Sequence, residues 1–204
     1  MNPWFDSKKT TEEIAQELLG MLVVKETDAG IVSGWIVETE AYLGEIDQAA
    51  HSYKLKKTPR LNSMYQEAGT IYIYSMHTHH MLNLVVQAKG IPEAVLIRGI
   101  EPFEGLAIME ERRAQTGFAV TDGPGKLTKA MGIDKSDDGS SILVPPLTIS
   151  QKERRYPQEV ELSKRIGIPN KGKWTEAFLR YSVKGNPYVS KLNGTIEPDY
   201  GWEK

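Results

Sequence analysis

Apolar residues recur along this chain with two periods, and each period predicts a different kind of element. Thr10 begins a capping-box pattern, and apolar residues at helical spacing follow it as far as Gly20. Residues 22–25 and 32–43 are strand-like and flank a turn, which predicts a pair of strands. The same criteria predict further strands over 70–74, 81–87, 94–100 and 178–183, an extended segment over 145–150, and helices over 102–115, 122–131 and 158–166.

No repeat, low-complexity tract or linker divides these elements, so we predict one mixed α/β domain over residues 1–204. A length of 204 residues suits one large domain, and 40% hydrophobic residues can form a substantial core. Residues 44–69 form a long polar connection. Ordered connections of that length are uncommon in compact domains and often carry function, so this segment is a candidate part of a site.

The composition restricts the chemistry available to the chain. Without cysteine there can be no disulfide, no cysteine-ligated zinc or iron–sulfur cluster and no thiol nucleophile. A net charge of −2 gives no general affinity for nucleic acid, which would require local basic patches such as residues 54–60. No apolar run is long enough to span a membrane, and the first ten residues lack a signal-peptide pattern. We expect a cytoplasmic protein, associated with the nucleoid if the source is bacterial.

The strand over 32–43 carries an unusual set of side chains on one face. Alternate residues of a strand share a face, so Glu38, Glu40 and Tyr42 point the same way, and His51 follows nine residues later. A solvated acidic face on an edge strand is the alternative, because exposed charges on half-buried strands are common.

Arg98 interrupts the apolar strand AVLIRGI. A guanidinium is costly to bury without a carboxylate or a ligand, so a partner is expected among Glu38, Glu40 and Glu101. A purely structural ion pair is the alternative to a catalytic role.

Two further groups of side chains suggest binding. Tyr42, Tyr72, Tyr74 and His51 are rings that could flank a flat base extruded from a nucleic acid, although each could equally be a core residue. The second group comprises His77, His79 and His80. A metal site is one interpretation, but no metal-binding signature accompanies these histidines, so solvated loop residues are the favoured interpretation.

Several segments, taken together and in order, resemble the alkyladenine (3-methyladenine) DNA glycosylase family. They are AQELLG, GWIVETEAYLGEIDQAAHS, TPRLNSMY, AGTIYIY, MLNLVV, AVLIRGIEPFEGL, DGPGKLTKAMGI, RIGIPNKGKW and RYSVKGNPYVS. The resemblance covers most of the chain. It implies a curved antiparallel sheet with a protruding β-hairpin and surrounding helices. It also implies an enzyme that binds double-stranded DNA containing damaged purines, with no metal or organic cofactor, and we expect a monomer. No lysine is marked as an amine nucleophile, which favours a monofunctional enzyme without strand-cleaving lyase action.

The resemblance also implies roles for individual residues. Glu40 corresponds to the general base that activates water, and Arg98 to the arginine that helps to hold this water. Three residues match the aromatic groups that enclose the flipped base: Tyr42, His51 and Tyr74. Asn83 matches an asparagine that crowds the exocyclic amine of normal guanine. Four residues fall where the family meets the DNA backbone and adjoining bases: Thr58, Arg60, Met64 and Lys126.

The predicted hairpin tip departs from the family pattern. Family members usually have a tyrosine there that wedges into the duplex, whereas this chain reads YSMHTHHMLN and is one residue shorter. Met76 and His77 are the nearest substitutes for the wedge.

Two other functions stay open at this stage. One is a non-catalytic nucleic-acid-binding module on the same fold, against which the presence of both Glu40 and Arg98 argues. The other is a metal-dependent hydrolase built on the histidines.

Overall fold

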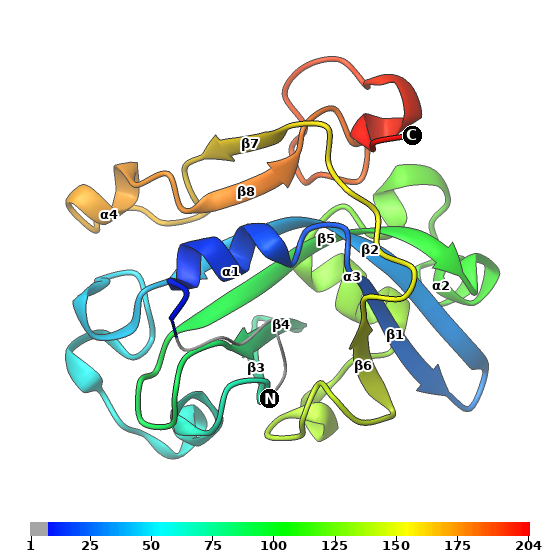
Figure 1. Ribbon diagram of the computed structural model, residues 1–204. Helices are drawn as coiled ribbons and strands as arrows, with labels where there is room; N and C mark the ends of the chain where they lie inside the picture. The colour runs from blue at the N-terminus through cyan, green and yellow to red at the C-terminus, as the bar shows by residue number, and fades with distance from the viewer. Residues whose placement is uncertain (1–7) are drawn as a thin grey trace.

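The computed structural model describes residues 8–204, in which one antiparallel sheet of eight strands runs through the molecule (Figure 1). The main path of the sheet is β3-β4-β5-β2-β1-β6, while β8 pairs with β2 and with β7. The strands are β1 (Leu22–Thr27), β2 (Gly30–Tyr42), β3 (Ile71–Met76), β4 (His79–Val85), β5 (Ala94–Glu104), β6 (Leu147–Ser150), β7 (Val160–Ser163) and β8 (Arg180–Val183). The helices are α1 (Thr11–Glu17), α2 (Leu106–Arg113), α3 (Pro124–Met131) and α4 (Lys173–Glu176).

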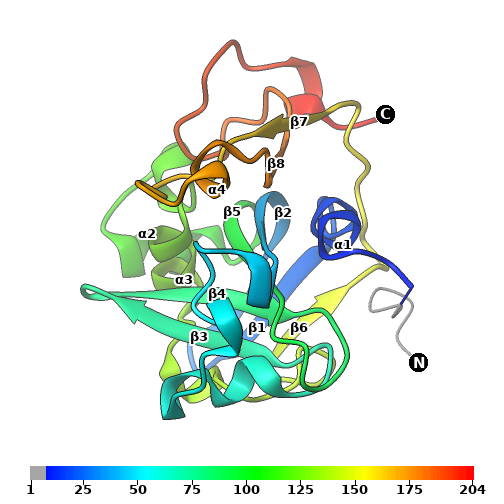
Figure 2. The same ribbon diagram turned by 90° about the vertical axis from the view of Figure 1, so that its left-hand side faces the viewer.

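The curled sheet, the hairpin and the surrounding helices confirm the predicted fold class. The hairpin of β3 and β4 extends to the left in Figure 2, beyond the rest of the sheet. The predicted capping box is present, since Thr10 Oγ1 accepts a hydrogen bond from the Glu13 amide and the Glu13 carboxylate accepts one from the Thr10 amide. Helix α1 packs on β2, where Thr39 donates to the Ala15 carbonyl, and α3 packs on β4 and β5. Among the described residues, no helix has the length and apolarity needed to cross a membrane.

Strand β2 is a central strand with three neighbours. Strand β5 runs along one of its edges, and the other edge pairs first with β1 over 30–35 and then with β8 over 38–40. Glu38 and Glu40 are therefore 0% exposed, and the alternative of a solvated acidic face is wrong. The register between β2 and β5 shifts on both sides of Glu38 and leaves Arg98 unpaired. Irregularities of this kind re-aim side chains and are frequent beside active sites.

Three element predictions need correction. Strand β5 continues to Glu104 where a helix was predicted from residue 102, because residues 101–104 pair with β2; the helix, α2, begins only at Leu106. The helix predicted over 158–166 is wrong, because residues 160–163 form strand β7 beside β8. The predicted tip at 75–80 is also too long, because the strands continue to Met76 and from His79, so that only two residues form the turn.

Candidate active site

Two buried carboxylates and a buried arginine meet at the C-terminal half of β2. Arg98 Nε lies 3.0 Å from Glu38 Oε1, and Arg98 Nη1 lies 3.3 Å from Glu40 Oε1. The expected partner for Arg98 is thus confirmed twice. Glu101, the third candidate, belongs to a separate cluster in which it accepts a hydrogen bond of 2.8 Å from Arg155.

Glu38 accepts four hydrogen bonds. Its Oε1 accepts from Arg98, from Arg180 Nε at 2.5 Å and from Ser190 Oγ at 2.8 Å, and its Oε2 accepts from the Ser190 amide at 2.8 Å. Gly99 permits this close approach of the C-terminal segment, because a Cβ there would lie 2.6 Å from the Tyr188 carbonyl oxygen. Glu38 is 0% exposed and two of its four donors are arginines, so the geometry suits it to holding these arginines.

Sequence reasoning gave Arg180 and Ser190 no role. Both lie in the segment RYSVKGNPYVS, which contributed to the family resemblance. Arg180 lies in a predicted strand, and an arginine in such a position indicates a buried acidic partner. Nothing in the sequence identified Glu38 as that partner.

Glu40 is held by fewer groups, and one of them, Tyr42, lines a pocket. Its Oε1 accepts from the Ile166 amide at 2.8 Å, and its Oε2 accepts from the Tyr42 hydroxyl at 2.8 Å. Burial raises the pKa of Glu40, and the opposing effects of Arg98 and of the two hydrogen bonds reduce this rise without cancelling it. Burial alone would lower the pKa of Arg98, but the carboxylates of Glu40 and Glu38 outweigh it and raise this pKa, so Arg98 remains charged.

The pocket that Tyr42 lines, and that Glu40 itself does not, has a volume of about 190 Å³. Pockets for drug-sized ligands occupy about 300–1,000 Å³, so this one suits a single flat ring system. It brings together all of the predicted base-binding residues, together with Met64 and Met76. Its lining comprises Tyr42, Ala49, Ala50, His51, Met64, Tyr72, Tyr74, Met76, Asn83, Ala94, Gly167 and Ile168.

The rings of this pocket are uncharged near neutral pH. The ring centroids of His51 and Tyr74 lie 4.5 Å apart at 81°, and His51 Nδ1 lies 3.0 Å from the Tyr72 hydroxyl oxygen. Burial, followed by the charges of Arg60 and Lys56, lowers the pKa of His51. Burial and the nearby Glu40 carboxylate raise the pKa of Tyr74 to about 12. The pocket thus presents neutral, electron-rich ring faces.

Asn83 is the polar group at the β4 side of the pocket. Its Nδ2 donates to the carbonyls of Tyr72 at 3.2 Å and Met81 at 3.0 Å. Since these bonds use the amino group, the oxygen is the part of this side chain that remains to meet a ligand. Such a fixed acceptor can discriminate between ligands by their donors.

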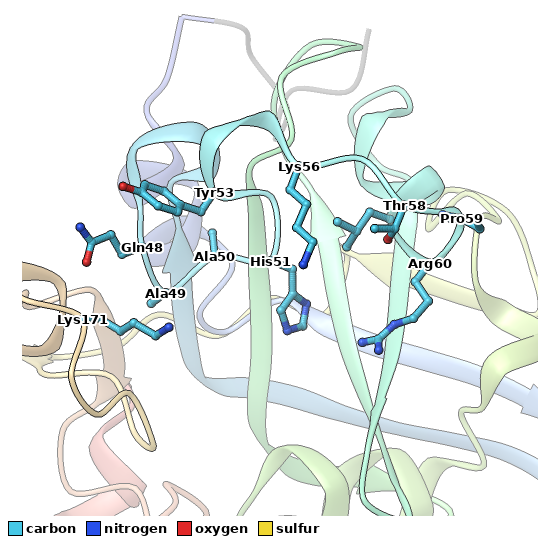
Figure 3. A pocket seen from close by; sticks show the side chains of 11 residues that line it. Gln48, Ala49, Ala50, His51, Tyr53, Lys56, Thr58, Pro59, Arg60 and Lys171 are labelled. Atoms are coloured by element: carbon cyan, nitrogen blue, oxygen red, sulfur yellow. The ribbon is translucent and has the colours of Figure 1, made fainter.

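A larger cleft of about 620 Å³ adjoins the pocket and shares its Ala49–His51 wall. Lys56, Arg60 and Lys171 point their charged ends toward the middle of this cleft, around His51 (Figure 3). Thr58 lies on its rim. Two of the predicted DNA-contacting residues, Thr58 and Arg60, thus lie together in a basic cleft.

The remaining predicted DNA-contacting residues lie elsewhere. Met64 is buried and lines the small pocket, while Met76 is 49% exposed where β3 ends. His77 follows it in the turn with a left-handed φ of +55°. Lys126 is on α3, outside both hollows, and its Nζ lies 2.7 Å from Asp122 Oδ1. The roles of these residues in DNA binding stay predictions.

The three histidines near the hairpin tip have different surroundings. His79 packs against Gly125 of α3, where an added Cβ would lie 2.7 Å from the His79 Cβ, and His80 Nδ1 lies 3.1 Å from Ser75 Oγ. Over residues 8–204, no group of three or more His, Cys, Asp or Glu side chains is arranged to hold a metal ion. The geometry therefore gives no support to a hydrolase built on these histidines.

Comparison with known proteins connects this geometry to one family. The family model for methylpurine-DNA glycosylase (MPG) matches residues 5–187. A protein of Enterococcus faecalis is 52% identical over 198 residues, which cover 96% of this chain and 86% of that protein. A protein of Staphylococcus saprophyticus is 48% identical over 197 residues, which cover 96% of this chain and 97% of that protein. Both relatives are provisionally named 3-methyladenine DNA glycosylase. The chain described here belongs to the methylpurine-DNA glycosylase family.

Proposed function

We propose that this protein is a DNA-3-methyladenine glycosylase of base-excision repair whose glycosylase domain spans residues 1–204. Family membership and the names of the relatives support the role in DNA repair. The observation that carries the finer proposal is the position of Glu40, a fully buried carboxylate that pairs with Arg98 and accepts a hydrogen bond from Tyr42, one of the rings of a pocket that suits a single ring system.

The substrate in this proposal is a damaged purine in double-stranded DNA. Its reactive bond is inaccessible inside the duplex, so the nucleotide is flipped out at a cost of a few kcal/mol, which is smallest for a base that pairs poorly. The base then enters the pocket between Tyr42, His51 and Tyr74. Neutral ring faces attract the positive charge of an alkylated purine by about 1–2 kcal/mol in a desolvated site.

The chemical step is hydrolysis of the N-glycosidic bond. Glu40 takes a proton from a water molecule while this water attacks C1′ of the sugar, and the purine leaves with the bonding electron pair. Arg98 stabilises the ionised form of Glu40 by its charge. The raised pKa of Glu40 makes it a stronger base, which suits proton abstraction near neutral pH. Water is the nucleophile in this scheme, so the enzyme is monofunctional and leaves the DNA strand intact.

A non-catalytic binding module on the same fold fits the site less well. Binding a flat base requires the rings of the pocket but not a buried carboxylate, and burying a charge is costly unless it is paired. The chain has placed Glu40 at 0% exposure with an arginine partner at 3.3 Å. This arrangement favours catalysis.

Release of free base from duplexes that each contain one defined lesion tests the proposal. The panel comprises 3-methyladenine, 7-methylguanine, hypoxanthine and ethenoadenine, with an undamaged duplex as the control. We expect release from one or more lesion duplexes, intact strands and no effect of chelators. Binding without release would favour the non-catalytic module, and loss of release on chelation would favour a metal-dependent hydrolase.

We expect Met76 and His77 to fill the gap that the flipped nucleotide leaves, with Met76 the more important. Met76 lines the base pocket, is half exposed and is flexible and apolar, whereas His77 is a polar side chain in the turn. Truncation of Met76 to alanine should weaken flipping about tenfold, since an inserted apolar wedge offsets part of the unstacking cost of a few kcal/mol per base step. A fluorescent base analogue reports the flipping.

The control for this measurement is Leu106→Ala, which truncates another exposed apolar side chain on α2 outside both hollows. If Met76→Ala and His77→Ala both flip the analogue as well as the wild type does, the hairpin tip is not the wedge.

Binding to undamaged DNA should be weak and sensitive to salt. The net charge is −2, so phosphate binding rests on local groups such as Lys56, Arg60 and Lys171 in the cleft. Each phosphate contact releases counterions, and Arg60→Gln should reduce the slope of log K against log salt by about one. Lys184→Gln, which removes an exposed charge paired with Glu159 outside the cleft, should leave the slope unchanged. An affinity that is independent of salt would contradict this prediction.

A further inference from the structure

A second buried ion pair lies directly behind the base pocket. Arg165 and Asp47 both have side chains that are 0% exposed, and they interact through two parallel contacts, Nη1 to Oδ2 at 2.5 Å and Nη2 to Oδ1 at 3.0 Å. Burying two charges is costly, and the paired contacts offset part of this cost, while Nε of Arg165 is buried without a hydrogen-bond partner. Neither residue contacts Glu38 or Arg98 by a hydrogen bond, and neither lines the pocket.

Arg165 also makes three other contacts, two with β2 and one with α4. Its Nη1 donates to the Ala41 carbonyl at the end of β2 at 3.0 Å, and its Nη2 donates to the Trp174 carbonyl in α4 at 3.4 Å. Its guanidinium carbon lies 4.6 Å from the ring centroid of Tyr42. Because Tyr42 lines the pocket and Arg165 does not, the guanidinium supports this ring from outside the pocket.

Asp47 organises the opposite wall. Besides Arg165, it accepts from the Leu43 amide at 3.2 Å and from the Ala49 amide at 2.9 Å. Ala49 begins the Ala49–His51 wall, which the pocket and the basic cleft share. The ion pair therefore joins this wall to the segment that begins at Arg165.

The residues that follow Arg165 reach the reacting centre. The amide of Ile166 donates to Glu40 Oε1 at 2.8 Å, and Gly167 and Ile168 line the pocket. Fixing the guanidinium of Arg165 thus fixes a hydrogen bond to Glu40 only one residue away. Buried arginines held by a carboxylate and a ring are well suited to such placement, because the planar fork has few alternative geometries.

We propose that Arg165, held by Asp47, is a positioning residue for base excision: it places the Ile166 amide against Glu40 and the Tyr42 ring against the base. This inference rests on the proposed glycosylase function. It assigns Arg165 no contact with the substrate.

The hydrogen bond from Ile166 gives the proposal a distinctive readout. The groups that face Glu40 are Arg98 from β5, Tyr42 and Glu38 from β2, Tyr74 from β3 and the Ile166 amide. A hydrogen bond to the charged form of a carboxyl lowers its pKa, so loss of the Ile166 contact should raise the pKa of Glu40 further. The activity of a general base is lost as the pH falls through its pKa. The acidic limb of the rate profile should therefore move to higher pH.

The test compares Arg165→Lys with Arg155→Lys in the full chain. Arg155 is a matched control because it contacts the Glu101 carboxylate at 2.8 Å and lies 4.8 and 4.9 Å from the rings of Trp35 and Trp202, outside the pocket. Lysine keeps the charge of either residue but loses the planar fork. Single-turnover release of hypoxanthine, a neutral base, is measured as a function of pH.

We expect the acidic limb of Arg165→Lys to move up by about one pH unit, while Arg155→Lys gives the wild-type profile. A folded Arg165→Lys variant with the wild-type profile overturns the inference. If Arg165→Lys does not fold, Asp47→Asn takes its place with the same expected shift, and a folded, unshifted Asp47→Asn also overturns it. If circular dichroism shows that neither variant folds, the pair is a requirement of the fold and the positioning role is rejected. Absence of release by the wild type from all four lesion duplexes would instead reject the proposed function, and if hypoxanthine alone is not released, the profiles are measured with a lesion that is.

Discussion

Replacing Glu40 by glutamine should lower base release from a lesion duplex by about 10²–10⁴-fold, because general base catalysis contributes that factor and an amide cannot take the proton. Binding of the lesion duplex should persist, since the pocket rings and the basic cleft are untouched. Single-turnover release and a gel-shift or fluorescence titration measure the two properties separately.

The surroundings of Glu40 make this variant a clean test. Glutamine can direct its oxygen at the Ile166 amide and Arg98 and its amino group at Tyr42, whose hydroxyl can rotate and accept. No donor is left facing another donor, so the fold should be retained. Turnover that stays within about tenfold of the wild type would contradict the general-base role, which requires a larger loss.

The half of the site that lies near in sequence was predictable. Alternation along β2 placed Glu38, Glu40 and Tyr42 together, and the cost of a guanidinium in an apolar strand required a carboxylate for Arg98. Both inferences depend only on short segments whose geometry the strand period fixes. The structure confirms both contacts of Arg98.

The other half depends on contacts between residues far apart in the chain. Ile166 reaches Glu40 across 126 positions, and Arg180 reaches Glu38 across 142. The periodic pattern of apolar residues along the chain does not predict contacts over such separations. The segment at 158–166 was predicted as a helix because its composition allows one, but pairing with β8 outweighs that weak local preference. Arg165 lies inside this mispredicted segment. Its ion pair with Asp47 could therefore be found only in the folded chain.

Replacing Glu38 by glutamine should have its largest effect on stability. Either orientation of the new amide fails, because the amino group would face the Ser190 amide in one and the two arginines in the other. Removing one partner of a buried ion pair costs about 3–5 kcal/mol. Arg98 would keep its contact with Glu40, so the folded fraction of Glu38→Gln should retain far more turnover than Glu40→Gln.

Denaturant unfolding and single-turnover base release, measured on the same samples, check this prediction. The matched control is Asp137→Asn, which breaks another buried ion pair, between Lys25 and Asp137, outside the pocket. Asp137→Asn should lose a comparable amount of stability and keep wild-type turnover. A loss of turnover in both variants would show that weakened folding, and not the active site, is the cause. If Glu38→Gln is as inactive as Glu40→Gln while its spectrum shows an intact fold, water activation does not belong to Glu40 alone. Glu38 would then have to exchange one of its four hydrogen-bond donors for the water molecule during the reaction.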